Sequence, residues 1–165
     1  MTRAKILAAL LRLPQWSLDH DTNEERIELL TPVAEAIHLE AHSAEEAAAL
    51  ISHSWKETKN ARLVLTGHCD QMPKGQQCDG GKARGPFQVH RWCTAAWDFP
   101  DGTLDSYRGG AHCVLRALRF GYINCHTWEG AFAGLRGKVV CDWDRAPSYV
   151  ETQTLVLVWW RTGVI

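Results

Sequence analysis

The sequence predicts a mainly α-helical protein that folds as a single domain over residues 1–165. Apolar residues recur at helical spacing in several segments, and two signals for the start of a helix precede such segments. No internal repeat, low-complexity tract or shift in composition marks a second domain. With 45% hydrophobic and 22% charged residues, a chain of this length can bury a core of its own.

Three helices are expected in the first part of the chain, at residues 3–13, 23–40 and 44–58. Pro14 ends the first helix, because proline cannot continue the hydrogen-bond ladder. The second and third helices each begin with a capping box, in which a Thr or Ser precedes a Glu by three residues (Thr22 and Glu25, Ser43 and Glu46). Pro32 lies inside the second helix and is expected to kink or split it.

Residues 60–84 are expected to form a loop or an irregular hairpin. The run ARLVLTG at its start is compatible with a short strand or with the end of the preceding helix. The rest is rich in glycine, proline and polar residues, and it contains Cys69 and Cys78. A loop of this length in a compact domain is usually functional or held by a covalent link.

Three further helices are expected, at residues 87–97, 110–121 and 127–135. The tail from Pro147 to Ile165 is ambiguous, because TLVLVWW favours a strand by propensity. The helical context of the chain favours a final helix there.

Charge and hydropathy exclude several functions. The formal net charge is −1, so no overall positive charge indicates nucleic acid or an anionic membrane as a partner. No apolar run reaches the length of a membrane-spanning helix, and no secretory signal is evident, because Arg12 interrupts the apolar run near the N-terminus.

The six cysteines favour disulfides and therefore an oxidising environment. Their pairing cannot be deduced from the sequence, and buried free thiols in a cytosolic protein are the alternative. Two other readings use Cys93. His90 and Cys93 have a ligand-like spacing for zinc, and a cysteine hydrolase would use such a thiol as its nucleophile.

Two residues are candidates for chemistry on a glycan. Glu57 ends an apolar helical run, and a glutamate at the edge of a cleft can stay protonated and act as a general acid. Gln88 offers a donor and acceptors to sugar hydroxyl or N-acetyl groups. His53 lies four residues before Glu57, on the same helical face. The alternatives are a solvated helix end for Glu57, beside two lysines, and an exposed amide for Gln88.

Three motifs in order resemble the soluble lytic transglycosylase and goose-type lysozyme superfamily, over residues 44–136. They are ETKNAR at 57–62, GPFQV at 85–89 and WEGAFAG at 128–134. The resemblance, closest to bacterial and phage lysozyme-like domains, implies a lysozyme-like fold with a small irregular hairpin beside the catalytic helix. It implies cleavage of the β-1,4 bond between N-acetylmuramic acid and N-acetylglucosamine in peptidoglycan, with no metal or organic cofactor.

The same resemblance assigns roles to individual residues. It makes Glu57 the catalytic acid and Thr58 a residue that orients it, and it places Gln88, Trp92 and Phe132 against the glycan. Asp70 and Asp79 lie where goose-type enzymes keep a second carboxylate, although each also fits a turn. His53 is expected to line the cleft or to tune the acid.

The sequence departs from the family at Phe132, which stands where a tyrosine near the catalytic glutamate is usual. The departure leaves open a non-catalytic peptidoglycan-binding or structural module with a degenerate site. The expected protein is a monomer that acts on glycan strands at the cell wall, as a periplasmic, extracellular or phage-delivered enzyme. Whether its product carries an anhydro or a reducing end is not decided by the sequence.

Overall fold

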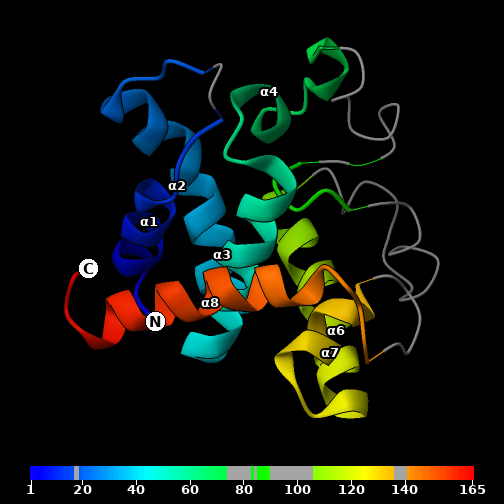
Figure 1. The fold of residues 1–165 in the computed structure, drawn as a ribbon. Coiled ribbons are helices and arrows are strands. Elements are labelled where there is room, and N and C mark those ends of the chain that lie inside the picture. Colours follow the sequence, from blue (N-terminus) through cyan, green and yellow to red (C-terminus); the bar gives the residue numbers. More distant parts are fainter. Residues whose placement is uncertain (17–18, 74–82, 84, 90–105, 136–140) are drawn as a thin grey trace.

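The computed structural model describes residues 1–16, 19–73, 83, 85–89, 106–135 and 141–165. This part of the chain is mainly helical, as the sequence predicts (Figure 1). Its α-helices are α1 (Arg3–Arg12), α2 (Asn23–Glu40), α3 (Ala44–Thr58), α4 (Arg62–Leu65), α6 (Tyr107–Cys125), α7 (Trp128–Gly134) and α8 (Ala146–Arg161), with a 3₁₀ turn η1 at Cys69–Gln71. None of the described residues lies in an extended strand. Of the loop or hairpin predicted at 60–84, residues 60–73 and 83 are described and contain α4 and η1 in place of strands, and the rest lies outside the described residues.

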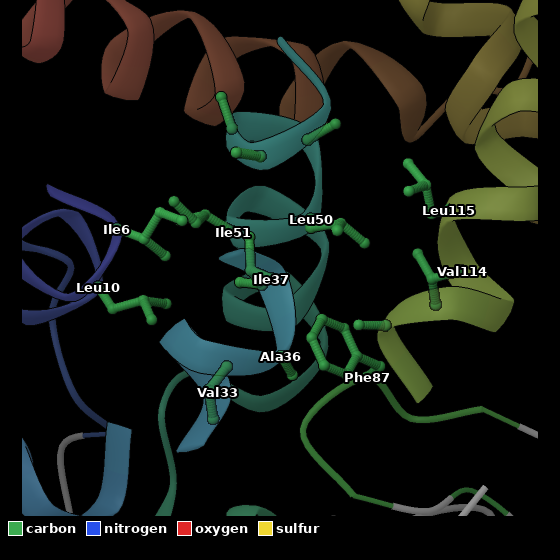
Figure 2. Close-up of a cluster of buried hydrophobic side chains, with 14 of the residues drawn as sticks. Ile6, Leu10, Val33, Ala36, Ile37, Leu50, Ile51, Phe87, Val114 and Leu115 are labelled. Atoms are coloured by element: carbon green, nitrogen blue, oxygen red, sulfur yellow. The ribbon is translucent and has the colours of Figure 1, made fainter. Parts of the chain in front are cut away.

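Helix α3 forms the centre of the core (Figure 2). It packs against α1, α2, α6 and α8, and Leu50 and Ile51 on it are fully buried. The three alanines Ala47–Ala49 are also fully buried, and their small side chains allow neighbouring helices to approach closely. Enclosure of α3 on several sides therefore fixes the place at which its C-terminal turn reaches the surface.

Helix α8 crosses α3 and is joined to it by hydrogen bonds as well as by apolar packing (Figure 1). The hydroxyl of Ser52 donates to the backbone carbonyl of Tyr149 over 2.6 Å. The amide of Gln153, 1% exposed, donates to the carbonyl of Glu45 over 3.0 Å. Buried polar groups that are paired in this way hold two helices in one register.

The tail of the chain is a helix despite its strand-like composition. Its buried residues recur at helical spacing on the side that faces α3 and α1: Tyr149, Gln153, Val156 and Trp160. Burial of this face therefore decides the conformation over the local β propensity. The preference for a final helix is confirmed, although α8 begins at Ala146, one residue before the predicted range, and ends at Arg161, before the end of that range.

Helices α6 and α7 approach so closely that glycine is required between them. An added Cβ at Gly121 would lie 2.4 Å from the carbonyl oxygen of Gly130. The disulfide between Cys125 and Cys141 joins the end of α6 to the segment that leads into α8. Packing and a covalent bond together hold α7 against α6.

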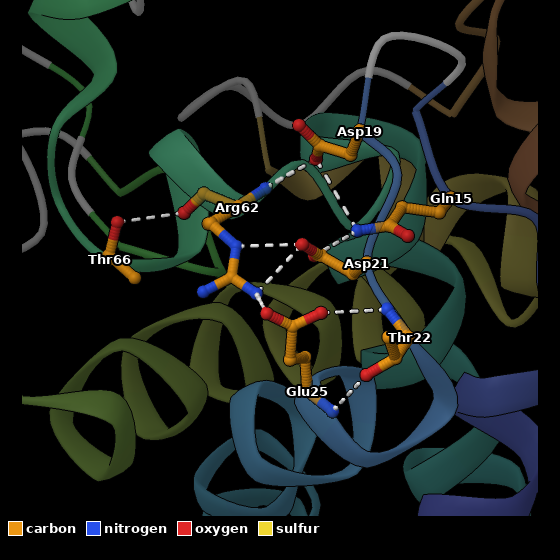
Figure 3. Close-up of polar contacts among 7 residues, drawn as sticks. All are labelled: Gln15, Asp19, Asp21, Thr22, Glu25, Arg62 and Thr66. Atoms are coloured by element: carbon orange, nitrogen blue, oxygen red, sulfur yellow. Dashed lines mark hydrogen bonds and ion pairs between the residues drawn. The ribbon is translucent and has the colours of Figure 1, made fainter.

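The two helix-start signals differ in the structure. Thr22 and Glu25 make the full reciprocal capping box, with bonds of 2.8 and 3.2 Å (Figure 3). Ser43 accepts from the backbone of Glu46 over 3.1 Å, as predicted. The carboxylate of Glu46 instead accepts from the backbone of His42 and from Arg119 of α6, so the second capping box is only half formed. The Glu46 carboxylate thus remains at the helix start, where it binds the residue before the cap and Arg119 of α6 in place of the cap residue itself.

A polar network attaches the linker after α1 to helix α4 (Figure 3). Arg62 binds Asp21 through two nitrogens over 2.7 and 2.8 Å, and its backbone N–H donates to Asp19 over 2.7 Å. Burial raises the pKa of Asp21, but hydrogen bonds from Arg62 and Gln15 outweigh it and lower the pKa below its usual value. The run that was compatible with a strand or a helix end is therefore a separate short helix, held by charge.

Two other details of the sequence interpretation are corrected. Residues 87–89 do not begin a helix, because Gly85–Gln88 form a turn and Val89 is an isolated bridge residue. Gly85 and Gln88 both have positive φ, 63° and 46°, which an α-helix does not accept. Pro32 does not split α2, which is continuous from Asn23 to Glu40.

In the part of the chain that the structure describes, no helix is both long and apolar enough to span a bilayer.

Replacing Gly121 with alanine is expected to destabilise the protein by about 1–3 kcal/mol, because the added methyl group would press on the backbone of α7. Thermal and denaturant unfolding would measure the loss. Ile123→Ala is the matched control, since Ile123 is 69% exposed on the same helix and should change stability by less than about 0.5 kcal/mol. Equal stability of Gly121→Ala and the native protein would contradict the close approach of α6 and α7.

Candidate active site

Glu57 lies on the last turn of α3, where that helix leaves the core, and its side chain is exposed. The hydroxyl of Tyr149 on α8 donates a hydrogen bond to Oε1 of Glu57. Oε2 has no hydrogen-bond partner among the described residues. One oxygen of the exposed carboxyl group is therefore held by the protein, and the other makes no hydrogen bond to the described residues.

Tyr149 is itself fixed by aromatic neighbours from two other segments. Its ring centroid lies 5.1 Å from that of Phe132 on α7 and 5.4 Å from that of Trp143. Phe132 is fully buried and Tyr149 is 7% exposed. Phe132 therefore packs against Tyr149 from the core. This differs from the expectation that Phe132 contacts the glycan at the surface.

The surroundings of Tyr149 keep its hydroxyl protonated. Burial raises its pKa above the ordinary value, and the negative charge of Glu57 and the hydrogen bond to it raise the pKa further. A phenol that does not ionise at neutral pH remains a hydrogen-bond donor to the carboxyl group.

Tyr149 is the site residue that sequence reasoning missed. The resemblance directed attention to α7, where Phe132 stands in place of a tyrosine. The hydroxyl beside Glu57 comes instead from α8, 92 residues further along the chain. The available signal was the helical spacing of Tyr149, Gln153 and Val156, but it lay in the segment with ambiguous secondary structure.

His53 joins the acid-bearing helix to the GPFQ segment. Its Nε2 lies 2.8 Å from the carbonyl oxygen of Phe87, and because a carbonyl only accepts, Nε2 carries the proton. The imidazole ring of His53 stacks on the ring of Tyr149, with 6.2 Å between the two ring centroids. His53 thus contacts both the GPFQ turn and the residue that binds Glu57, in agreement with its position four residues before the acid.

His53 is held in the neutral form. Burial lowers its pKa, and this effect exceeds the opposing influences of the Glu57 charge and of the bond to Phe87. Its Nδ1 is buried without a hydrogen-bond partner among the described groups, so a second proton there would be buried without an acceptor. His53 is therefore a neutral structural support of the site at pH 7.

The GPFQ turn is anchored by an apolar side chain. Phe87 is 1% exposed and lies between α3 and α6, where a Cβ at Gly110 would be 3.2 Å from its ring (Figure 2). The side chain of Gln88 is half-buried, and its amide donates to the carbonyl of Gly85 over 2.9 Å. The turn is brought close to α3, but the Gln88 donor is used within the turn itself.

Thr58 closes the end of α3. Its hydroxyl donates to the carbonyl of Ser54 over 2.8 Å and accepts from the backbone of Asn60 over 3.0 Å. The residue is buried, and neither of these bonds goes to Glu57. In this structure Thr58 shapes the exit of the chain from the helix.

Three of the predicted site residues receive no structural account. Trp92 and Asp79 lie outside the described residues. Asp70 lies in η1, but its side chain is not described. A second carboxylate therefore remains a prediction from the sequence.

The cysteine predictions are partly resolved. Cys125 pairs with Cys141, and Cys69 and Cys113 are also disulfide-bonded, so the alternative of free thiols is wrong for these four. His90 and Cys93 lie outside the described residues. Within the described ranges, no group of three or more His, Cys, Asp or Glu side chains is arranged to hold a metal ion.

No protein-family model matches this chain, and neither a curated protein nor a solved structure matches it. The family resemblance of the three motifs therefore remains a prediction from the sequence.

The buried neutral His53 predicts a pH dependence of stability. Because its pKa is lower in the folded than in the unfolded chain, its contribution is complete above about pH 6.5 and is lost as the pH falls below that value. His53→Gln should remove a slope that approaches about 1.4 kcal/mol per pH unit. Denaturant unfolding between pH 7 and pH 5 would measure it.

His68→Gln is the control for this experiment, because His68 is exposed. It should retain the pH dependence of the native protein. If His53→Gln shows the same slope as the native protein, His53 is not held neutral by burial.

Proposed function

We propose that this protein cleaves the β-1,4 bond between N-acetylmuramic acid and N-acetylglucosamine in peptidoglycan, with Glu57 as the general acid. The observation that carries the proposal is the hydrogen bond from Tyr149 to Glu57 at the exposed end of α3. Two helices meet at this carboxyl group, α3, which carries it, and α8, which supplies Tyr149. His53, four residues before Glu57 on α3, contacts the GPFQ turn through the carbonyl of Phe87.

The lysozyme-like identity of the fold belongs to the same proposal. It is supported by the order of the three motifs and by a helical core built around the helix that carries the acid. The central position of α3 suits catalysis, because a proton donor must keep its position while a polymer binds and leaves.

In the proposed reaction, Glu57 gives a proton from Oε2 to the glycosidic oxygen as the bond from C1 of the muramic acid breaks. The N-acetylglucosamine leaves with a new 4-hydroxyl group, and C1 acquires oxocarbenium character. Tyr149 holds Oε1 and stabilises the carboxylate that forms. When the 6-hydroxyl of the same sugar attacks C1, the ionised Glu57 takes its proton, which regenerates the acid. When water attacks from the opposite face, the second carboxylate would take the proton of the water, and Glu57 would be reprotonated from solvent.

Either of two nucleophiles can attack C1 and complete the reaction. Attack by the 6-hydroxyl of the same sugar gives a 1,6-anhydro end and requires no second carboxylate. Attack by water gives a reducing end and would use a second acid to position the water, for which Asp70 and Asp79 are the candidates. In both outcomes Glu57 protonates the leaving oxygen and Tyr149 holds Oε1.

A non-catalytic peptidoglycan-binding module is the second candidate function. The observation that favours it is the exposure of Glu57, because catalysis by a proton donor is more effective in a site that excludes water. Bound glycan would have to exclude water from this carboxyl group for the catalytic function to operate.

Glu57→Gln is expected to lower the cleavage of purified peptidoglycan by at least roughly a hundredfold, because the proton donor is lost. Mass spectrometry of the sugar ends would follow the reaction and would identify anhydro or reducing products. Glu28→Gln, an exposed change of the same type on α2, should leave activity unchanged. Equal activity of Glu57→Gln and the native protein would exclude the role given to Glu57, and inactivity of both would favour the binding module.

Tyr149→Phe tests the second part of the proposal. It retains the aromatic packing with Phe132 and Trp143 but removes the donor to Glu57. The turnover rate should fall roughly tenfold to a hundredfold, as for loss of one hydrogen bond to a charged group. Tyr122→Phe is the matched control, since its ring is 42% exposed on α6. A rate unchanged in Tyr149→Phe would show that the hydroxyl does not assist the acid.

A further inference from the structure

Two lysines lie against one tryptophan ring beside Glu57. The ammonium group of Lys59 is 3.8 Å from the ring centroid of Trp55, and that of Lys56 is 5.1 Å from it. The indole N–H of Trp55 donates to the carbonyl of Pro14 over 2.8 Å, which fixes the plane of the ring. The ring thus holds two positive charges at a defined place on the surface.

The position of Lys59 is set by the backbone. Lys59 has a left-handed conformation with φ 51°, and its N–H closes the last turn of α3 by donating to the carbonyl of Trp55 over 2.7 Å. The chain turns away at this residue, and Lys59 is directed back over the ring. The arrangement is therefore built by the end of the helix rather than by a flexible side chain alone.

Neither of these two charges forms an ion pair with a carboxylate in the described part of the chain. Among the described residues, no ion pair within 4.0 Å involves Lys56 or Lys59. Burial lowers the pKa of Lys59, and repulsion by Lys56 lowers it further, against the attraction of Glu57. Two like charges held together cost free energy that an anionic ligand would recover.

We infer that Trp55, Lys56 and Lys59 form a subsite for the carboxylate groups of the peptide stems that peptidoglycan strands carry. The assignment rests on the proposed function, which supplies the polymer. In that polymer each stem is attached through the lactyl group of muramic acid, the same sugar whose C1 bond is cleaved. The lysines are the sequence neighbours of Glu57, so a stem next to the scissile bond can reach them.

The two lysines have a simpler alternative role. Cations at the C-terminus of a helix are favourable, and Lys59 interacts with the charge of Glu57. If the two lysines only stabilise α3 or interact with Glu57, replacing them will change the binding of peptidoglycan with and without stems to the same extent. The peptide subsite affects only substrates whose stem carboxylates are intact, so the choice of substrate separates the two roles.

The test measures the binding of Glu57→Gln protein, which retains the polymer uncleaved, to three forms of peptidoglycan free of teichoic acid. The first is intact, the second has its stem carboxylates amidated, and the third is stripped of its stems by an amidase. Adding Lys56→Gln and Lys59→Gln together should weaken binding to the intact form roughly fivefold to tenfold. Binding to the other two forms should not change.

Two further variants complete the test. The pair Lys56→Arg and Lys59→Arg keeps the charge and should retain binding to intact peptidoglycan. The pair Arg3→Gln and Lys5→Gln removes the same charge from exposed positions on α1 and should have no effect. Equal weakening on all three forms, or on none, would overturn the subsite. Lysine-dependent binding without cleavage by the native protein would keep the subsite and reject the proposed catalysis.

Discussion

The enclosure of helix α3 is the constraint on which the rest of this structure depends. Four helices pack around it, and the buried bonds from Ser52 and Gln153 set its register against α8. Its middle is buried from Ala47 to Ser54, and its C-terminal turn reaches the surface and carries Glu57. A carboxyl group at the end of so firmly held a helix keeps its position without a rigid loop around it. The site therefore takes its geometry from the core.

The relation between Phe132 and Tyr149 shows how one aromatic position can be supplied from another element. Phe132 lacks the hydroxyl that the resemblance called for, but its buried ring supports the tyrosine that has one. The donor to Glu57 thus arrives from α8, through packing that runs from α7. A substitution that made the site look degenerate in the sequence is compatible with an intact set of polar groups in three dimensions.

The sequence predicted those parts of the fold that local signals determine. Capping residues and apolar spacing located α1, α2 and α3, and the position of Glu57 at the end of α3 followed from them. The GPFQ turn was taken for a helix start, because the positive φ of a non-glycine residue such as Gln88 has no local signature. Tyr149 could not be assigned to the site, because its partner Glu57 is 92 residues away and only tertiary packing joins them. The role of Glu46 was missed for the same reason, since its partner Arg119 lies on α6.

The disulfide between Cys125 and Cys141 closes a covalent ring that contains all of α7. Closing a loop of this length removes chain entropy from the unfolded state worth about 3 kcal/mol in the simplest treatment. When α7 separates from α6 in a local fluctuation, the ring limits how far it can move. Phe132, which lies inside the ring, is thereby kept near its contact with Tyr149. The disulfide thus supports the position of the hydrogen bond to Glu57 through two sulfur atoms that take no part in it.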